Sequence, residues 1–131
     1  MPGKSQFHTD AVLNVLRGTD LTGVAPYVGL FSVAPADDNS AGTELAGNGY
    51  ARQAITFGAP VTDAGNVRKV ANTNNIQFGP ALANWSEAVA FGVFASLAGA
   101  LLYWDTLPTP KTVEQDDFGQ FAVGTLVVKE D

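Results

Sequence analysis

Apolar side chains recur at three- and four-residue steps in only one part of the chain, its first segment. One side of the predicted helix comprises Phe7, Ala11, Val12, Val15 and Leu16, and the opposite side is polar. Ser5 is placed to cap its N-terminus, and Gly18 is placed to end it. A helix this short is marginal in water by itself. We therefore expect its apolar side to dock on the domain's own sheet or on a neighbouring subunit.

After Gly23 the pattern changes to short runs separated by Gly, Pro, Asn and Asp. These runs predict strands at residues 27–33, 50–57, 75–78, 85–94, 100–105 and 118–128, and a hairpin tip with one weak strand at residues 61–70. The run at 85–94 is almost wholly apolar, which predicts a central strand. Pro108 and Pro110 are expected to stop the strand that starts at residue 100. Residues 36–48 read as a loop.

Turn signals fall about every ten residues along these strands. Seven or eight strands at that spacing favour an all-β fold, a β-sandwich or a jelly-roll-like domain, with one short N-terminal helix. The length of 131 residues suits a single domain. We predict one domain over residues 1–131, with a helical extension at 1–23 and the β-sandwich at 24–131.

The amino-acid composition narrows the kinds of partner that we expect this protein to bind. Charged residues make up 15% of the chain, against a usual share of about 25%, as expected for a surface that an assembly covers. The net charge is −6 and the seven Lys and Arg residues are scattered, so we expect no nucleic-acid partner. The chain has no cysteine, which excludes disulfides and thiolate chemistry. It shows no signal peptide and no apolar run near the ~20 residues of a membrane span, so we expect synthesis in the cytoplasm and no membrane partner.

Candidate chemistry is sparse. His8 is the only histidine and sits in the predicted helix, far in sequence from any nucleophile, so we interpret it as a helix-surface residue. Two acidic loops, at residues 37–39 and 114–117, contain oxygen ligands that calcium could use, but neither has the spacing of a twelve-residue calcium loop. Solvated turns are the favoured interpretation, with calcium left open. We expect no catalytic residues, no metal and no cofactor.

Trp85 and Trp104 fall in predicted strands, where a core position is favoured over a carbohydrate platform. Tryptophan is also enriched at protein interfaces, so both stay candidates for contact residues. The predicted interface residues are Phe7, Val12 and Leu16 of the helix, Asp37 and Asp38 at the start of the loop that runs to residue 47, Trp85 and Trp104.

Several short motifs, in order, resemble small virion proteins of tailed bacteriophages, many of them labelled phage tail fiber protein. The motifs are residues 2–5 (PGKS), 16–19 (LRGT), 27–32 (YVGLFS), 42–45 (GTEL), 49–53 (GYARQ), 57–59 (FGA), 72–73 (NT), 77–78 (QF), 91–94 (FGVF) and 102–104 (LYW). The resemblance spans nearly the whole chain. Residues 66–70 are more basic, and residues 114–118 more acidic, than this family leads us to expect.

The resemblance implies a virion structural protein, made in the host cytoplasm. The interpretation we favour is a capsid decoration or cement protein on the exterior of the head, where it would bind the major capsid protein and copies of itself as a dimer or trimer. The alternative is a tail, baseplate or fibre component that binds other tail proteins. A receptor- or glycan-binding role would predict that Trp85→Ala or Trp104→Ala abolishes host adsorption while the protein still folds.

Overall fold

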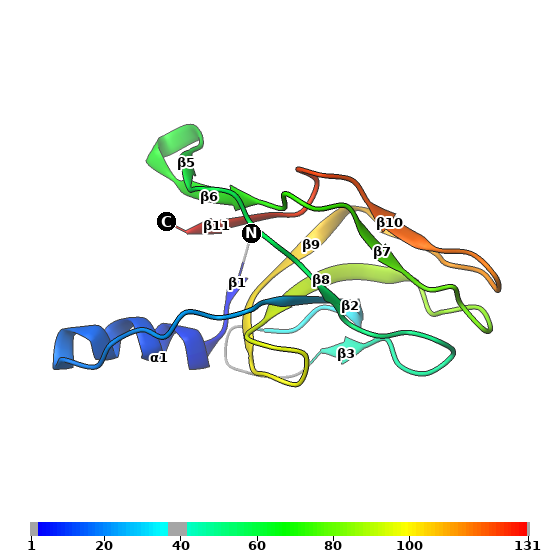
Figure 1. Ribbon diagram of the computed structural model, residues 1–131, viewed down its shortest axis with the longest axis horizontal. Coiled ribbons are helices and arrows are strands. Elements are labelled where there is room, and N and C mark those ends of the chain that lie inside the picture. Colours follow the sequence, from blue (N-terminus) through cyan, green and yellow to red (C-terminus); the bar gives the residue numbers. More distant parts are fainter. Residues whose placement is uncertain (1–2, 37–41, 131) are drawn as a thin grey trace.

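The computed structural model describes residues 3–36 and 42–130, and most of its regular structure is β (Figure 1). The described strands are β1 (Gly3–Lys4), β2 (Tyr27–Val33), β3 (Thr43–Glu44), β4 (Gln53–Ala54), β5 (Val61–Thr62), β6 (Arg68–Ala71), β7 (Ile76–Phe78), β8 (Ala88–Phe94), β9 (Leu101–Lys111), β10 (Gly119–Phe121) and β11 (Val127–Glu130). The helices are α1 (Gln6–Asn14) and two short 3₁₀ turns, η1 (Val15–Arg17) and η2 (Ala64–Asn66).

The largest sheet has the strand order β1-β9-β8-β2-β3, and β4 also pairs with β2. Two smaller sheets, β10-β7 and β11-β6-β5, complete the described fold, and every described strand pair is antiparallel. Strand β8 lies between β9 and β2, which confirms the central position predicted from its continuous apolar run.

The main core lies between the large sheet and the two small ones. Buried side chains from β2 and β8 cluster with those of β7, β10 and β11; examples are Leu30, Val93, Phe78, Phe121 and Val128. The all-β, sandwich-like fold with one short helix is therefore confirmed, while this arrangement of one large and two small sheets does not confirm a jelly roll.

Two strand predictions were wrong in extent. The strand predicted at 50–57 is reduced to β4, because Tyr50 and Arg52 turn inward to a carboxylate instead of extending a ladder. The strand predicted at 118–128 is two strands in different sheets. A turn separates them, in which the Thr125 backbone N–H donates to the Ala122 carbonyl oxygen at 3.2 Å and Gly124 has φ +83°.

The prediction that prolines stop the strand after residue 105 was also wrong, since β9 continues to Lys111. Ala90 pairs with Thr106 but Ala88 pairs with Lys111, so the ladder to β8 is interrupted by a bulge. Pro108 and Pro110 lie in that bulge, where no ladder N–H is needed.

The N-terminus is anchored to the large sheet before the helix begins. Gly3 and Lys4 pair with Trp104 and Tyr103 of β9, and the fully buried Ser5 donates its hydroxyl to the Leu101 carbonyl oxygen at 2.5 Å. The same hydroxyl oxygen accepts the His8 backbone N–H at 3.1 Å, as predicted for the N-cap of α1. Gly18, at φ +88°, ends the helical segment as predicted.

Candidate interaction surface

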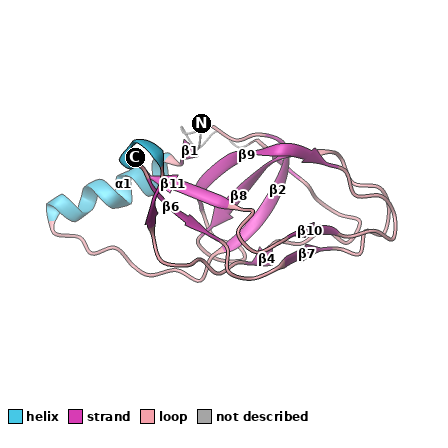
Figure 2. Cartoon of the chain, turned by 90° about the horizontal axis from the view of Figure 1, so that it is seen from above, coloured by secondary structure: helices cyan, strands magenta, loops and turns pink. Residues whose placement is uncertain are grey.

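The helical segment leaves the body of the protein and returns as an extended chain (Figure 2). We call residues 6–25 the arm. Its first turn is held against β9, where the His8 ring contacts the Tyr103 ring edge-on with 4.9 Å between centroids. Ala11 and Val12 are half-buried, but every residue from 15 to 25 is exposed. The apolar stripe of the helix thus begins on the protein's own sheet and continues beyond it into solvent.

The arm displays large apolar side chains that the rest of the described chain covers only in part. They are Phe7 (53% exposed), Leu13 (55%), Val15 (45%), Leu16 (86%), Leu21 (52%) and Val24 (49%). Single exposed apolar residues are ordinary on protein surfaces, but a group of them on one projecting segment is typical of an interaction surface.

The predicted interface residues separate into groups. Phe7, Val12 and Leu16 all lie on the arm. Trp85 is buried, and its Nε1–H donates to the Asn48 carbonyl oxygen at 2.8 Å, so it belongs to the core. Trp104 is half-buried in β9 beside β1.

Asp37 and Asp38 lie outside the described residues, so the solvated turn favoured for that loop, with calcium as the alternative, stays a prediction. Residues 114–117 are described, and they are a turn in which the Asp117 N–H donates to the Glu114 carbonyl oxygen at 3.0 Å. Across residues 3–36 and 42–130, no group of three His, Asp or Glu side chains is placed to hold a metal ion. No helix in this described part is long and apolar enough to cross a membrane.

Sequence reasoning missed Leu13, Leu21 and Val24 as members of the exposed apolar group. Leu13 falls outside the apolar side of an ideal helix, and the other two lie in residues 19–25, which have no periodic pattern. The available signal was the presence of large apolar residues in a segment that predicts neither a helix nor a strand.

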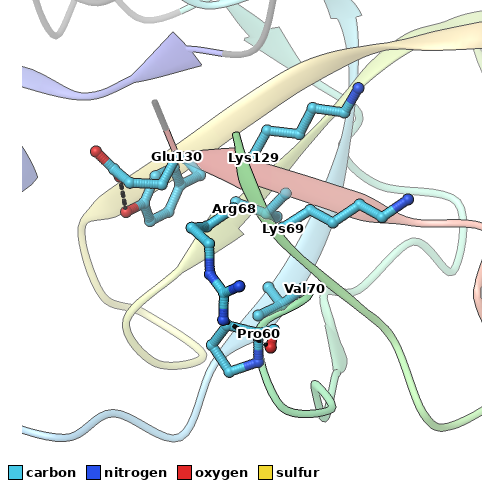
Figure 3. A pocket seen from close by; sticks show the side chains of 8 residues that line it. Pro60, Arg68, Lys69, Val70, Lys129 and Glu130 are labelled. Carbon is cyan, nitrogen blue, oxygen red and sulfur yellow. Dashed lines mark hydrogen bonds between the residues drawn. The ribbon is translucent and has the colours of Figure 1, made fainter. Parts of the chain in front are cut away.

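A surface cavity of about 410 Å³ opens beside the base of the arm, between β6, β11 and β9 (Figure 3). Apolar atoms dominate its lining, which includes Pro60, Val70, Tyr103 and Val128. Charged side chains surround this apolar floor; they are Arg68, Lys69, Lys129 and Glu130. The cavity therefore suits an apolar group that carries a charge beside it.

Most of the cationic side chains near this cavity form ion pairs with carboxylates. Lys4 Nζ lies 2.5 Å from Glu130 Oε1, and the Tyr103 hydroxyl donates to Glu130 Oε2 at 2.5 Å. Although desolvation raises the pKa of Glu130, these two hydrogen bonds lower it overall. Lys129 and Lys69 approach the Asp63 carboxylate at 2.9 and 3.6 Å.

Arg68 is held differently. Its guanidinium donates to the Thr62 hydroxyl at 2.5 Å and to the Pro60 carbonyl oxygen at 3.0 Å, both neutral acceptors. Within the described chain, Arg68 forms no ion pair. Figure 3 shows its side chain extending toward Pro60, away from the two lysines. The cavity thus has a positioned guanidinium that forms no ion pair with a carboxylate of residues 3–36 and 42–130.

A second group of polar side chains is half-buried. Arg52 binds the Glu44 carboxylate through two hydrogen bonds, at 2.8 and 3.0 Å, and its guanidinium lies 3.4 Å from the centroid of the Phe94 ring. The Tyr50 hydroxyl donates to Glu44 Oε2 at 2.7 Å and accepts the Leu30 N–H at 2.9 Å. Burial, and then the Glu44 hydrogen bond, raises the pKa of Tyr50 above its ordinary range. We call Glu44, Tyr50 and Arg52 the Glu44 cluster; it ties β3 and the chain before β4 to β2 and β8 of the same sheet.

The Glu44 cluster also explains what the sequence motifs encode. Its residues come from GTEL and GYARQ, and they contact the strands that contain YVGLFS and FGVF. These four motifs therefore help to hold β2, β3, β8 and the chain before β4 together.

The family described as Podophage GP4 fiber I protein gp80 matches residues 3–129. The chain belongs to this family. It is a phage structural protein associated with the virion, as the motif resemblance implied. A comparison with curated proteins finds no match.

Proposed function

We propose that this protein is a structural subunit of the phage tail fibre apparatus and that it acts by making contacts rather than by catalysis. The arm is the part that reaches a neighbouring subunit. The single observation that carries the proposal is the run of exposed residues 15–25 with its apolar side chains. A fibre protein family supports a tail position at least as well as the capsid position that we favoured from the sequence.

The arm has the properties that an attachment segment needs. Its root is fixed by the β1 pairing and by the buried Ser5, so the helix leaves the sheet in a defined direction. Its outer half presents apolar surface that is stabilised only when a partner covers it. Covering a large apolar side chain contributes roughly 1.5–3 kcal/mol relative to full exposure, so several of them together support a specific contact.

The position of the protein on the particle can be tested by labelling. Antibodies against the chain should decorate the tails of purified virions, at a copy number well below that of the major capsid protein. Labelling confined to the head, at a copy number close to that of the major capsid protein, would contradict the tail proposal and support capsid decoration.

The role of the arm can be tested with paired substitutions. Leu16→Asp should reduce the amount of protein on particles about tenfold or more, because a charge replaces an apolar contact. Leu82 is 68% exposed, and the segment after β7 that contains it lies at the end of the molecule away from α1 (Figure 1). Leu82→Asp is therefore the matched control and should leave incorporation unchanged. Equal incorporation of both variants would exclude the arm as the attachment segment.

The glycan-binding alternative loses one of its two candidate residues. Trp85 packs in the core and its ring meets the Tyr50 ring edge-on, so it presents no stacking face to a sugar. The sequence-based expectation that Trp85→Ala would leave folding intact is corrected accordingly, because removing a buried tryptophan costs about 3–5 kcal/mol.

A further inference from the structure

We infer that the arm of one copy of this chain docks in the cavity beside Arg68 on a second copy, with Leu21 on the apolar floor and Asp20 against the Arg68 guanidinium. This inference rests on the proposed function, since it names the partner of the arm. The observation that supports it is the chemical complementarity between the exposed side chains of the arm and the lining of the cavity.

The chemistry of the two surfaces is complementary. Asp20 and Leu21 are adjacent and exposed, so the arm offers a carboxylate beside an apolar side chain. The cavity offers the complementary arrangement, in which the positive charge of Arg68 lies beside an apolar floor at Val70. Asp20, like Arg68, forms no ion pair within residues 3–36 and 42–130. Each charge is therefore available to the other across an interface.

The position of the two surfaces allows a closed contact. The arm and the strands β6 and β11, which line the cavity, lie at the same end of the molecule in Figure 1. The Lys4–Glu130 ion pair and the His8–Tyr103 ring contact join the two regions. A two-fold axis at this end would place each arm on the other copy's cavity, and both contacts would form together. In such a dimer both arms and both cavities are occupied, so further copies cannot add to form an open-ended filament.

Light scattering with size-exclusion chromatography of the purified full chain tests whether a second copy of the chain is the partner of the arm. The wild-type protein should have a mass of about twice 13.6 kDa at high concentration. Arg68→Asp and Asp20→Arg should each weaken association about tenfold or more, and the double variant should restore it, because the pair is re-formed with its charges exchanged. Lys111→Asp reverses a cation that lies over the Phe121 ring instead, and is the matched control. A wild-type chain that stays monomeric, or a double variant no better than the singles, would overturn the inference.

The absence of cysteine allows a direct test of the docking geometry. Leu21→Cys and Pro60→Cys chains, mixed in equal amounts under mild oxidation, should form the mixed disulfide in preference to either homodisulfide. Leu82→Cys mixed with Pro60→Cys is the control and should show no such preference. Absence of a preferred mixed disulfide contradicts the docking, whatever the mass of the wild-type chain. Virion labelling tests the proposed function separately, because a monomer in solution can still be found on the tail.

Discussion

Gly29 shows how a single residue permits the Glu44 cluster. A Cβ at this position would lie 2.7 Å from Glu44 Oε2, 2.9 Å from the Tyr50 hydroxyl and 3.0 Å from the Phe94 ring. The first two atoms belong to side chains fixed by several hydrogen bonds, so they have little freedom to move away. The glycine therefore gives close approach rather than a special backbone angle.

We predict that Gly29→Ala lowers the free energy of unfolding by about 1–3 kcal/mol, the usual effect of overpacking a filled site. Gly23→Ala is the matched control, because a Cβ there meets no atom within 4 Å, and we expect a change within about 0.5 kcal/mol. Denaturant titration of both variants measures the difference. Equal stability of the two would show that the Glu44 cluster can shift to accept a methyl group.

At the scale of elements, the sequence predicted best where a pattern is local. The limits of β2, the N-cap of α1 and the end of the helical segment at Gly18 follow from neighbouring residues, and all were predicted. The short β4 and the split between β10 and β11 depend on partners distant in sequence. Glu44 draws in residues 50–52, and Asn72 accepts the Leu126 N–H at 2.9 Å, fixing the chain after the turn. Periodicity carries no information about such long-range hydrogen bonds.

The hairpin of β5 and β6 joins β11 through a charge arrangement that depends on pH. Lys69 and Lys129 are direct partners in the ladder, where like charges repel, and the Asp63 carboxylate lies close to both. The Lys129 hydrogen bond, and then the Ala64 N–H, lowers the pKa of Asp63 from 3.8 to about 2. The unfolded chain therefore takes up this proton at a higher pH than the folded chain.

The stability that Asp63 contributes is complete above about pH 4 and should be lost as the pH falls toward 2. We predict that Asp63→Asn reduces the fall in unfolding temperature between these two pH values. Asp10→Asn, which removes an exposed carboxyl that pairs with no described cation, is the control and should retain the wild-type fall. An identical pH profile for Asp63→Asn would exclude this carboxylate as the cause.

At the scale of the whole molecule, the N-terminal segment has two separable parts. The sequence indicated a helix that needs a partner, but a prediction from one chain cannot show which part of the apolar stripe the chain itself covers. In the structure, residues 3–5 of this segment belong to the large sheet, and the outer arm extends beyond the sheet. The cavity at the base of the arm was not predicted, because β6, β9 and β11 come together only in the folded protein.

Deleting the N-terminal segment and changing only the apolar side chains of the arm should have different effects on stability. Deletion of residues 1–18 should lower the free energy of unfolding by about 2–3 kcal/mol, since the β1 pairing and the Ser5 hydrogen bonds are lost. Replacing Leu13, Leu16 and Leu21 together by Ser should change it by less than about 0.5 kcal/mol per site, as for other exposed residues. Calorimetry on dilute protein compares the stability of the deletion variant with that of the triple variant. Equal losses of unfolding free energy would mean that the arm packs on its own domain.

Pro108 and Pro110 bear on how the protein behaves when many copies accumulate before assembly. An open strand edge can recruit strands from other chains and seed aggregates. Beyond β1, the outer edge of β9 pairs with no other strand of the described chain, yet two of its positions have no N–H to offer. The two prolines therefore oppose growth of the sheet from one copy to the next along this edge.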